Sequence, residues 1–572
     1  MRYALLTHPT TVWYLINSNI LNFMPLIANS ITRNKSLFVS LVVISQFVLA
    51  AVPLRAEVLS TNLTASESAI QTLEITKIKR SLDAREADEI EELNESEKGK
   101  EELKKLGEEA AEKAGNLCPN QLPRSIERVV NQYGRSQWGI LVTNLKTNQV
   151  LYELNPDQFI TPASNVKLLT SAAALHQLGS NFRIRTSVYD RLNDRNTGLL
   201  SNPDNSLVLV GRGDPSLDNA QLQRLGQQLE NKGRRNINLL LGDDSYFQGE
   251  MFNPYWAWAD IQSTDAPPVS SLIINQSYVT LSLVPQKLWE PLRLNWSDEL
   301  VANQWRITNN SQTSRSGSTV DVDFSPNNNA LRISGSLGVN ADPEEVYLPV
   351  LEPSSYVVQR FQAELKKLGI NVNQTQAPKS RSPLVIPSNS SEVAAVESAP
   401  LANLLVEMNR ESNNFYAEML SRQVGKVATG DDRNWVAAVG ESLTNLGVDP
   451  QGYKIVDSSG LARQNQVTPR AIVQTLQGMA NSPEATAYRD SLSLAGENGT
   501  LRNRLKNIPG NFWGKTGTLR GVVALSGYLD VPSYDPLVVS IIVNNPQQST
   551  TTLRQGTDGI VTQISRLQAC SN

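Results

Sequence analysis

The chain has 572 residues, enough for two or three domains, and its 40% hydrophobic and 19% charged residues are typical of a soluble globular protein. A formal net charge of −4 without a basic stripe gives no electrostatic reason to expect nucleic-acid binding. The sequence also contains no zinc-ligand spacing and no phosphate-binding glycine loop, so it implies no metal and no organic cofactor.

Residues 1–56 have the order of a secretory signal. Arg33 and Lys35 precede an apolar run over residues 37–52, and Ala56 offers a small residue for cleavage. We therefore expect an exported protein of the periplasm or cell envelope. The alternative is an uncleaved N-terminal anchor, because the apolar run approaches the length that spans a membrane. Any membrane association is expected through this segment alone.

Residues 57–116 form a charged segment rich in Glu, Lys and Ala, without an aromatic residue between Ser66 and Gly115. Opposite charges four residues apart favour a solvated helix, but apolar positions are too few for a sustained coiled coil. We expect a partly helical, partly disordered tether, and the alternative is a partner-binding coil.

The globular pattern begins near Cys118, and the second of the two cysteines is Cys570. In an exported protein, a sparse and even cysteine count favours one disulfide joining the ends of the folded part. Two unrelated free thiols are the alternative.

The elements that follow alternate between β and helical patterns. Residues 137–154 predict a hairpin with its turn at 146–148, and Pro162 precedes a strong helical run that begins near Ser164. The later elements are a mostly β stretch over about 181–391 with a helix at 355–368, a helix at 401–410, and β runs at 522–529 and 537–543.

Ser164 and Lys167 are three residues apart at the start of the predicted helix, so their side chains share one face. The free N–H of Ser164 can hold an oxyanion there, and the positive helix end together with a nearby cation should lower the pKa of Lys167, as a general base requires. A Ser-His-Asp triad is excluded because His176 would lie about 18 Å along the helix. On its own, a Ser-x-x-Lys pair also occurs by chance.

Two further motifs supply small polar groups and a second lysine. Ser412-Asn413-Asn414 follows a helix and is, by itself, typical of a helix cap. Lys515-Thr516-Gly517-Thr518 lies between an aromatic turn (512–514) and a β run. On a strand edge it would offer a cation, a hydroxyl and N–H groups to a peptide ending in a carboxylate, and Gly517 would let a ligand approach the backbone. The alternative is a surface turn with an incidental lysine.

In this order, the three motifs match the signature of β-lactamases and penicillin-binding proteins, with Ser-x-Asn in place of Ser-Asp-Asn. From about 118 to 570, the chain resembles the D-alanyl-D-alanine carboxypeptidases/endopeptidases of the class C low-molecular-mass penicillin-binding proteins. The step of 248 positions from Ser164 to Ser412 fits that branch, which carries domains inserted there. Further short motifs that match this branch lie at residues 211–218, 242–247, 457–463 and 514–521.

The resemblance implies an α/β (α+β) fold, a transpeptidase/β-lactamase-like antiparallel sheet with helices. It would be assembled from residues 117–185 and 395–572, with mainly β inserted domains over 186–394. The segment 457–463 is expected to support the site structurally, and Asp214 is expected in a turn.

Residue roles follow from the matched positions. Ser164 would be the acylated nucleophile and Lys167 its base. The remaining roles would be proton relay for Ser412, substrate amide binding for Asn414, positive charge and relay for Lys515, carboxylate binding for Thr516, and an oxyanion hole from the N–H groups of Ser164 and Thr518.

The expected function is therefore a serine-type D-Ala-D-Ala carboxypeptidase or DD-endopeptidase. It would hydrolyse D-Ala-D-Ala termini or D-Ala cross-links of peptidoglycan stem peptides through an acyl-enzyme, with β-lactams as covalent inhibitors. One alternative is a β-lactamase or esterase on the same fold, against which the long insertion argues. Another is a non-hydrolysing wall-peptide binding protein, which the intact serines and lysines disfavour.

Overall fold

The computed structural model describes residues 116–191, 205–377 and 390–570. The predicted signal or anchor over 1–56 and residues 57–115 of the predicted tether lie outside these described ranges. Among the described helices, none combines the length and the apolar character that a membrane span requires.

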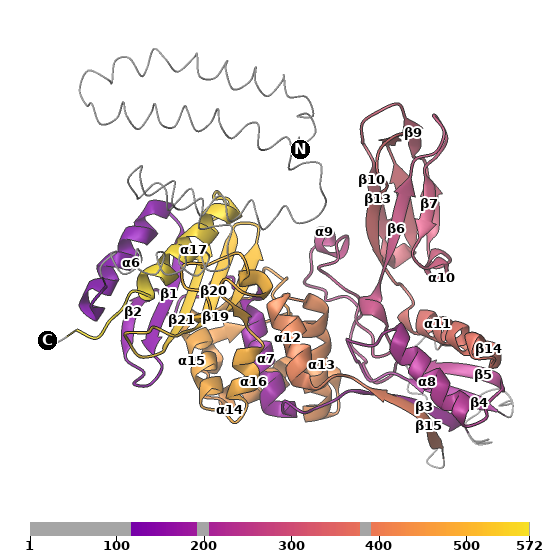
Figure 1. The fold of residues 1–572 in the computed structure, drawn as a ribbon, viewed down its shortest axis with the longest axis horizontal. Helices are drawn as coiled ribbons and strands as arrows, with labels where there is room; N and C mark the ends of the chain where they lie inside the picture. The colour runs from indigo at the N-terminus through magenta and orange to yellow at the C-terminus, as the bar shows by residue number, and fades with distance from the viewer. Residues whose placement is uncertain (1–115, 192–204, 378–389, 571–572) are drawn as a thin grey trace, which may run out of the picture. The chain divides into compact units, whose positions relative to one another are not determined.

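A six-stranded antiparallel sheet forms the centre of the part that carries the site (Figure 1). Its order, β18-β19-β20-β21-β1-β2, places the N-terminal hairpin beside the last strand of the chain, with Ile140 opposite Ile541. The predicted hairpin is confirmed. The strands are β1 (Gln137–Asn144), β2 (Val150–Leu154), β18 (Ser493–Leu494), β19 (Phe512–Leu519), β20 (Val522–Leu529) and β21 (Leu537–Asn544).

Helices cover both faces of this sheet (Figure 1). On one face lie α6 (Leu122–Val130) and α17 (Thr550–Ile564). The helices of the other face are α7 (Val166–Leu178), α12 (Leu401–Arg410), α13 (Asn414–Thr429), α14 (Trp435–Asn445), α15 (Pro469–Ala480) and α16 (Ala485–Asp490).

A hydrophobic core lies on each face of the sheet, and alternate side chains of each strand point into one core or the other. In β1, Leu141 packs into the core beside α7, whereas Ile140 and Val142 pack into the core beside α6 and α17. Helix α7 is buried at every position from Val166 to Leu175, so it lies inside the molecule with protein on all sides. A 3-10 turn, η4 (Ala163–Asn165), leads into it.

The stretch between β2 and α12 contains a five-stranded mixed sheet of order β14-β5-β4-β3-β15. Two neighbouring pairs are parallel, β4 with β5 and β5 with β14. Helix α8 (Asn219–Asn231) precedes β5 in the chain, and helix α11 (Pro353–Lys367) precedes β14, as parallel connections require. The helix predicted at 355–368 is confirmed by α11, but α8 was not predicted. The strands are β3 (Arg185–Arg191), β4 (Ser206–Val210), β5 (Asn236–Asp243), β14 (Asn371–Gln376) and β15 (Ser391–Glu397).

Smaller sheets complete this stretch and share a hydrophobic core with the five-stranded sheet. One sheet consists of β6 (Tyr278–Val284), β7 (Arg293–Trp296) and β13 (Glu344–Pro349); the others consist of β8 (Arg306–Asn309), β10 (Asp321–Ser325) and β11 (Ala330–Ser334), and of β9 (Gln312–Ser314) and β12 (Ser336–Gly338). The short helices are α9 (Trp258–Ile261) and α10 (Glu299–Ala302), and β16 (Tyr453–Lys454) pairs with β17 (Gln466–Val467) elsewhere in the chain.

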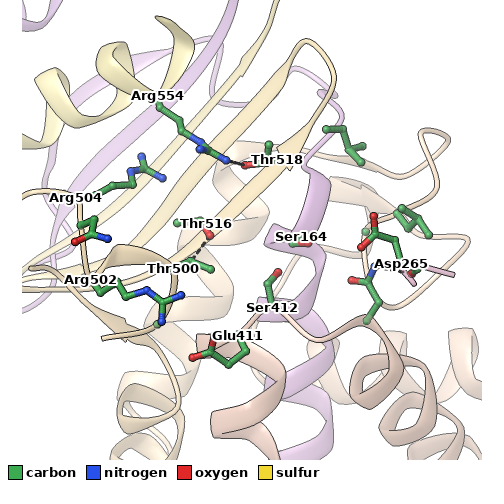
Figure 2. A pocket seen from close by; sticks show the side chains of 16 residues that line it. Ser164, Asp265, Glu411, Ser412, Thr500, Arg502, Arg504, Thr516, Thr518 and Arg554 are labelled. Carbon is green, nitrogen blue, oxygen red and sulfur yellow. Dashed lines mark hydrogen bonds between the residues drawn. The ribbon is translucent and has the colours of Figure 1, made fainter. Parts of the chain in front are cut away.

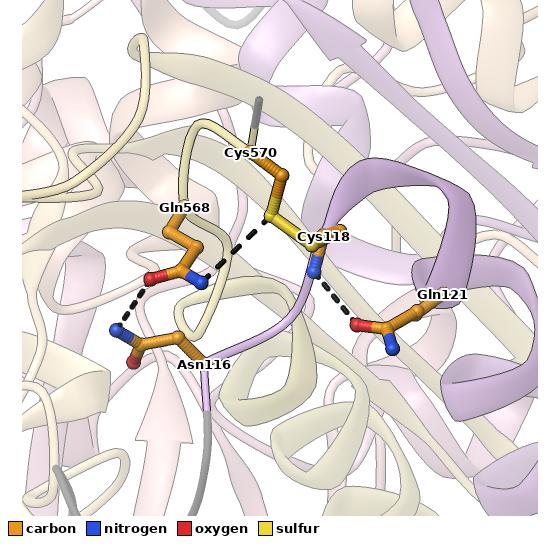
Figure 3. Close-up of a disulfide and its surroundings, with 5 residues drawn as sticks. All are labelled: Asn116, Cys118, Gln121, Gln568 and Cys570. Carbon is orange, nitrogen blue, oxygen red and sulfur yellow. Dashed lines mark hydrogen bonds between the residues drawn. A yellow bond between two sulfur atoms is a disulfide. The ribbon is translucent and has the colours of Figure 1, made fainter. Parts of the chain in front are cut away.

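A disulfide joins Cys118 to Cys570 across 452 positions of sequence (Figure 3). The backbone N–H of Cys118 donates to the Gln121 side chain at 2.9 Å, and Asn116 donates to Gln568 at 2.8 Å. The two ends of the described chain are therefore held together beside α6 and the end of α17.

Candidate active site

The turn that carries Ser164 has an unusual backbone. Ala163, just before it, has a φ of 47°, a left-handed conformation that is uncommon for residues with a side chain. Two glycines from distant segments pack against the turn. A Cβ atom on Gly460 would lie 2.0 Å from the Ala163 carbonyl oxygen, and one on Gly517 would lie 2.6 Å from the Pro162 carbonyl oxygen. Both contacts constrain the backbone that positions the Ser164 hydroxyl.

Gly517 was expected to let a ligand approach the backbone, but its contacts indicate a role in packing. The position that a Cβ atom on Gly517 would take is occupied by the Pro162 carbonyl oxygen, at 2.6 Å, and by the Cβ of Ala163, at 3.2 Å. The residues before it differ as well: Phe512 to Gly514 were predicted as an aromatic turn, but they belong to strand β19. Gly517 therefore lets strand β19 and the turn that carries Ser164 pack closely.

Lys167 is completely buried one turn after Ser164. Its amine contacts three acceptors: the Ser164 hydroxyl at 3.2 Å, the Asn414 side-chain oxygen at 2.6 Å and the Ser459 carbonyl oxygen at 2.6 Å. The three partners come from η4, α13 and the loop after β16. Ser164 and Lys167 are thus brought together as the sequence predicted, in a position fixed by two other segments.

Burial lowers the pKa of Lys167 to about 8, although the negative charges of Asp457, Glu418 and Asp265 oppose this shift. From the sequence, we expected the helix end and a neighbouring cation to lower the pKa of Lys167. The dominant cause is instead desolvation of the amine inside the protein.

Glu418 and Asp457 hold the loop that supplies the Ser459 carbonyl. Oε1 of Glu418 accepts the backbone N–H groups of Ser458 and Ser459 at 3.1 and 3.0 Å. Asp457 accepts the Gly460 N–H at 2.7 Å, together with side chains from other segments. Burial and the charge of Asp457 raise the pKa of Glu418 to about 7. The segment 457–463 has the supporting position predicted for it.

Ser412 lies between α12 and α13 with a φ of 59°, a second left-handed residue at the site. The amine of Lys515 donates to its hydroxyl at 2.9 Å and to the Thr516 carbonyl oxygen at 2.8 Å. Lys515 is completely buried, and burial together with the charge of Lys167 holds its pKa well below the usual range. The positive charge expected on Lys515 is therefore disfavoured by its surroundings.

Asn414 begins helix α13 and connects two parts of the site. Its side-chain oxygen accepts from Lys167, and its amide nitrogen donates to the backbone carbonyl of Asp265 at 2.7 Å. The amide nitrogen expected to bind substrate is therefore engaged by the segment before β6 in this structure.

Thr516 and Thr518 lie on β19 beside the site. The Thr516 hydroxyl donates to the Thr500 hydroxyl at 2.8 Å, and Arg554 of α17 donates to the Thr518 hydroxyl at 3.2 Å. Figure 2 shows both hydrogen bonds, and Thr516 and Thr518 both line the cavity described next.

A cavity of about 420 Å³ joins these groups, with Ser164 and Ser412 at its centre (Figure 2). Its lining also includes residues that were not predicted from the sequence as site residues. Gly460, Leu461 and Leu519 lie in the matched segments 457–463 and 514–521, and the residues that were not identified are Asp265, Glu411, Gly499, Thr500, Arg502, Asn503, Arg504 and Arg554. No local pattern marks these residues, because they come from loops and helices that only the fold brings to the cavity. Asp214 is absent from this lining and accepts from the Ser216 N–H at 2.8 Å, consistent with the predicted turn.

Comparisons with known proteins agree on one family. A model described as the D-Ala-D-Ala carboxypeptidase 3 (S13) family matches residues 122–567. A D-alanyl-D-alanine carboxypeptidase of Actinomadura sp. (strain R39) is 31% identical over 429 residues, which are 71% of this chain and 77% of the relative.

Solved structures match the same region. Penicillin binding protein 4 (dacB) of Haemophilus influenzae has a TM-score of 0.66 and 23% identity, covering 77% of this chain and 99% of that one. The same protein complexed with a novel β-lactam has a TM-score of 0.62 and 22% identity, with the same coverage. The predicted α+β fold, an arrangement of a sheet with helices, is therefore confirmed.

Proposed function

The chain belongs to the D-Ala-D-Ala carboxypeptidase 3 (S13) family, as a class C low-molecular-mass penicillin-binding protein, and from this premise we propose how its serine DD-peptidase chemistry is carried out. Ser164 attacks the carbonyl carbon of a D-alanyl peptide bond and forms an ester with the D-alanyl residue. The released amine leaves, and water then hydrolyses the ester to regenerate the serine.

The observation that carries this assignment is the set of three acceptors around Lys167. A charged amine can donate to all three, whereas a neutral amine has two N–H groups and one lone pair. The contacts to Asn414 and Ser459 are shorter, at 2.6 Å, than the contact to Ser164, at 3.2 Å. Loss of a proton therefore leaves the lone pair facing Ser164, where it accepts the hydroxyl proton as the serine attacks.

The second amine and hydroxyl take part at the other side of the cavity. The proton that Lys167 takes from Ser164 passes to the leaving amine through the Ser412 hydroxyl. Lys515 helps this relay by holding that hydroxyl in place through its hydrogen bond at 2.9 Å. The N–H groups of Ser164 and Thr518 hold the oxyanion. Asn414 binds the substrate amide once its own amide leaves the Asp265 carbonyl, and Thr516 binds the terminal carboxylate, with Gly517 keeping the strand close.

The substrates and inhibitors follow from this chemistry. Peptidoglycan stem peptides end in D-alanyl-D-alanine and are joined through D-alanine, and β-lactams acylate serine enzymes of this kind. The β-lactam complex of the related Haemophilus protein supports the second assignment. Such peptides occur outside the cytoplasmic membrane, which supports an exported location in the periplasm or cell envelope.

We also propose that residues 117–185 and 395–572 fold as one transpeptidase-like domain and that 186–394 form the inserted part. Support comes from the central sheet, whose strands lie only within 137–154 and 493–544. Residues 1–56 would be the signal or anchor, and 57–116 the tether.

Labelling with a fluorescent penicillin tests the nucleophile. Wild-type protein should become covalently labelled, and mass spectrometry should place the adduct on Ser164. Ser164→Ala should lose both the label and the release of D-alanine from purified muropeptides, whereas Ser334→Ala, on an exposed strand position of β11, should keep both. Persistent labelling of Ser164→Ala would refute the assignment.

A further inference from the structure

The cavity has a pronounced charge asymmetry around the two serines. In Figure 2, Arg502, Arg504 and Arg554 lie on the side of Thr516, and Asp265 lies on the opposite side of Ser164. All four residues line the cavity. The arginines come from the segment after η9 (Gly499–Leu501) and from helix α17, so two separate elements contribute cations to the same side.

The three arginines differ in how they are paired. Arg504 forms an ion pair with Asp558 at 2.6 Å and also donates to Thr557. Within the described residues, neither Arg502 nor Arg554 forms an ion pair, and the Arg554 guanidinium donates to the neutral Thr518 hydroxyl at 3.2 Å. Two guanidinium groups thus face the cavity without a carboxylate partner.

The surroundings favour an anion at this position. Partial burial and the charge of Arg504 lower the pKa of Arg554, and the charge of Asp558 opposes this shift. Asp558 is held by Arg504, and Glu411 lines the cavity next to Ser412 in the sequence. A ligand carboxylate between Arg502 and Arg554 would gain charge-assisted hydrogen bonds.

Resting on the proposed function, in which Thr516 binds the carboxylate of the released residue, we infer that Arg502 and Arg554 form a subsite for a second carboxylate on the leaving group. Released D-alanine has one carboxylate, and it occupies Thr516. The strand released from a D-alanine cross-link carries additional carboxylates from its own stem peptide. The subsite therefore favours peptides whose leaving part is diacidic or larger, and it makes cross-links good substrates.

Three matched synthetic peptides test this inference on the purified full chain. Each has the donor Nα,Nε-diacetyl-L-lysyl-D-alanine, followed by D-alanine, D-glutamine or D-glutamate as leaving group. The D-glutamine peptide matches the size of the D-glutamate peptide without its second charge. Wild type should cleave the D-glutamate peptide with a kcat/KM about tenfold above that of the D-glutamine peptide, which is the effect of one charge-assisted hydrogen bond.

Variants then locate the preference. Arg502→Gln with Arg554→Gln should reduce the D-glutamate to D-glutamine ratio to about one, and Arg502→Lys, which keeps the charge, should retain part of it. Arg332→Gln, at an exposed position of β11, should leave the ratio unchanged. High salt should reduce the wild-type ratio because it screens the exposed guanidinium groups.

Two results would overturn the inference: a wild-type ratio near one, or an equal loss for all three peptides in the double variant, which would place both arginines at the terminal carboxylate. Penicillin labelling and D-alanine release report separately on the proposed function. If both persist while the ratio is one, only the subsite is refuted; if both are absent, the proposed function fails and the subsite with it.

Discussion

The amine of Lys167 and the backbone carbonyl of Ser459 are 2.6 Å apart, although 292 positions of sequence separate them. This hydrogen bond fixes one N–H of the lysine on a loop that Glu418 holds through two backbone N–H groups. The proposed general base therefore depends on a carboxylate that is not itself among the residues lining the cavity.

The rate of acylation should rise with pH through a limb near 8. Burial lowers the pKa of Lys167 to about 8, and only its neutral form can accept the Ser164 proton, so the active fraction grows as pH increases through that value. Stopped-flow acylation by a chromogenic β-lactam between pH 5.5 and 9.5 measures the limb. A rate that is constant or falls over this range would contradict the assignment of Lys167 as the base.

Replacing Glu418 by Gln should move that limb to lower pH. The Glu418 charge raises the pKa of Lys167, so its removal lets the amine lose its proton more readily, whereas a Gln oxygen can still accept the N–H groups of Ser458 and Ser459. The same acylation profile measures the shift. Glu441→Gln, at an exposed position of α14, is the matched control and should leave the limb in place. An upward shift in Glu418→Gln would show that the carboxylate does not act through its charge.

Glu418 should also make stability depend on pH. Its pKa is raised from an ordinary value of 4.5 to about 7, so the folded chain binds the proton more tightly than the unfolded chain. The contribution of Glu418 to the free energy of unfolding is then fully present below about pH 4.5 and is lost as pH rises through about 7. The Tm of wild type relative to Glu418→Gln should accordingly fall between pH 5 and 8, and a constant difference would argue against the shift.

Gly460→Ala should slow acylation by about a hundredfold, the cost of an ångström-scale displacement of a nucleophile. The added Cβ would lie 2.0 Å from the Ala163 carbonyl oxygen, and the φ of 85° adds strain. Gly233→Ala is the matched control, because its φ is 75° but no atom lies within 4 Å of the added Cβ. The control should acylate normally. Equal effects of the two substitutions would mean that backbone strain, and not contact with the turn of Ser164, causes the loss.

Removing the disulfide should lower stability more than activity. Cys118 and Cys570 close a loop of 452 positions, for which loop-entropy models give about 6 kcal/mol. The double Cys→Ser variant should have a Tm several degrees lower, while penicillin acylation at 25 °C remains. If the double variant has the same Tm as the oxidised wild type, the other contacts between the chain ends are sufficient to hold the folded state together without the disulfide.

Part of the fold was accessible from local patterns. The hairpin at 137–154 and the helix now seen as α11 were predicted because alternation and helical periodicity are properties of a short stretch. Helix α8 was not predicted, although Asp218 and Gln221 form a capping box at its start. Most residues of α8 are polar, so the few apolar residues on the face that packs against the five-stranded sheet gave no clear helical pattern.

The sequence by itself determined the family, the three motifs and the proximity of Ser164 to Lys167, because a helical turn brings residues three apart together whatever surrounds them. Only the tertiary structure decided the rest. It buried both lysines and so lowered their pKa values, placed Ser459 and Glu418 behind Lys167, and brought Arg502 and Arg554 to one side of the cavity. Desolvation and long-range packing depend on atoms contributed by segments hundreds of residues away, and no local pattern records them.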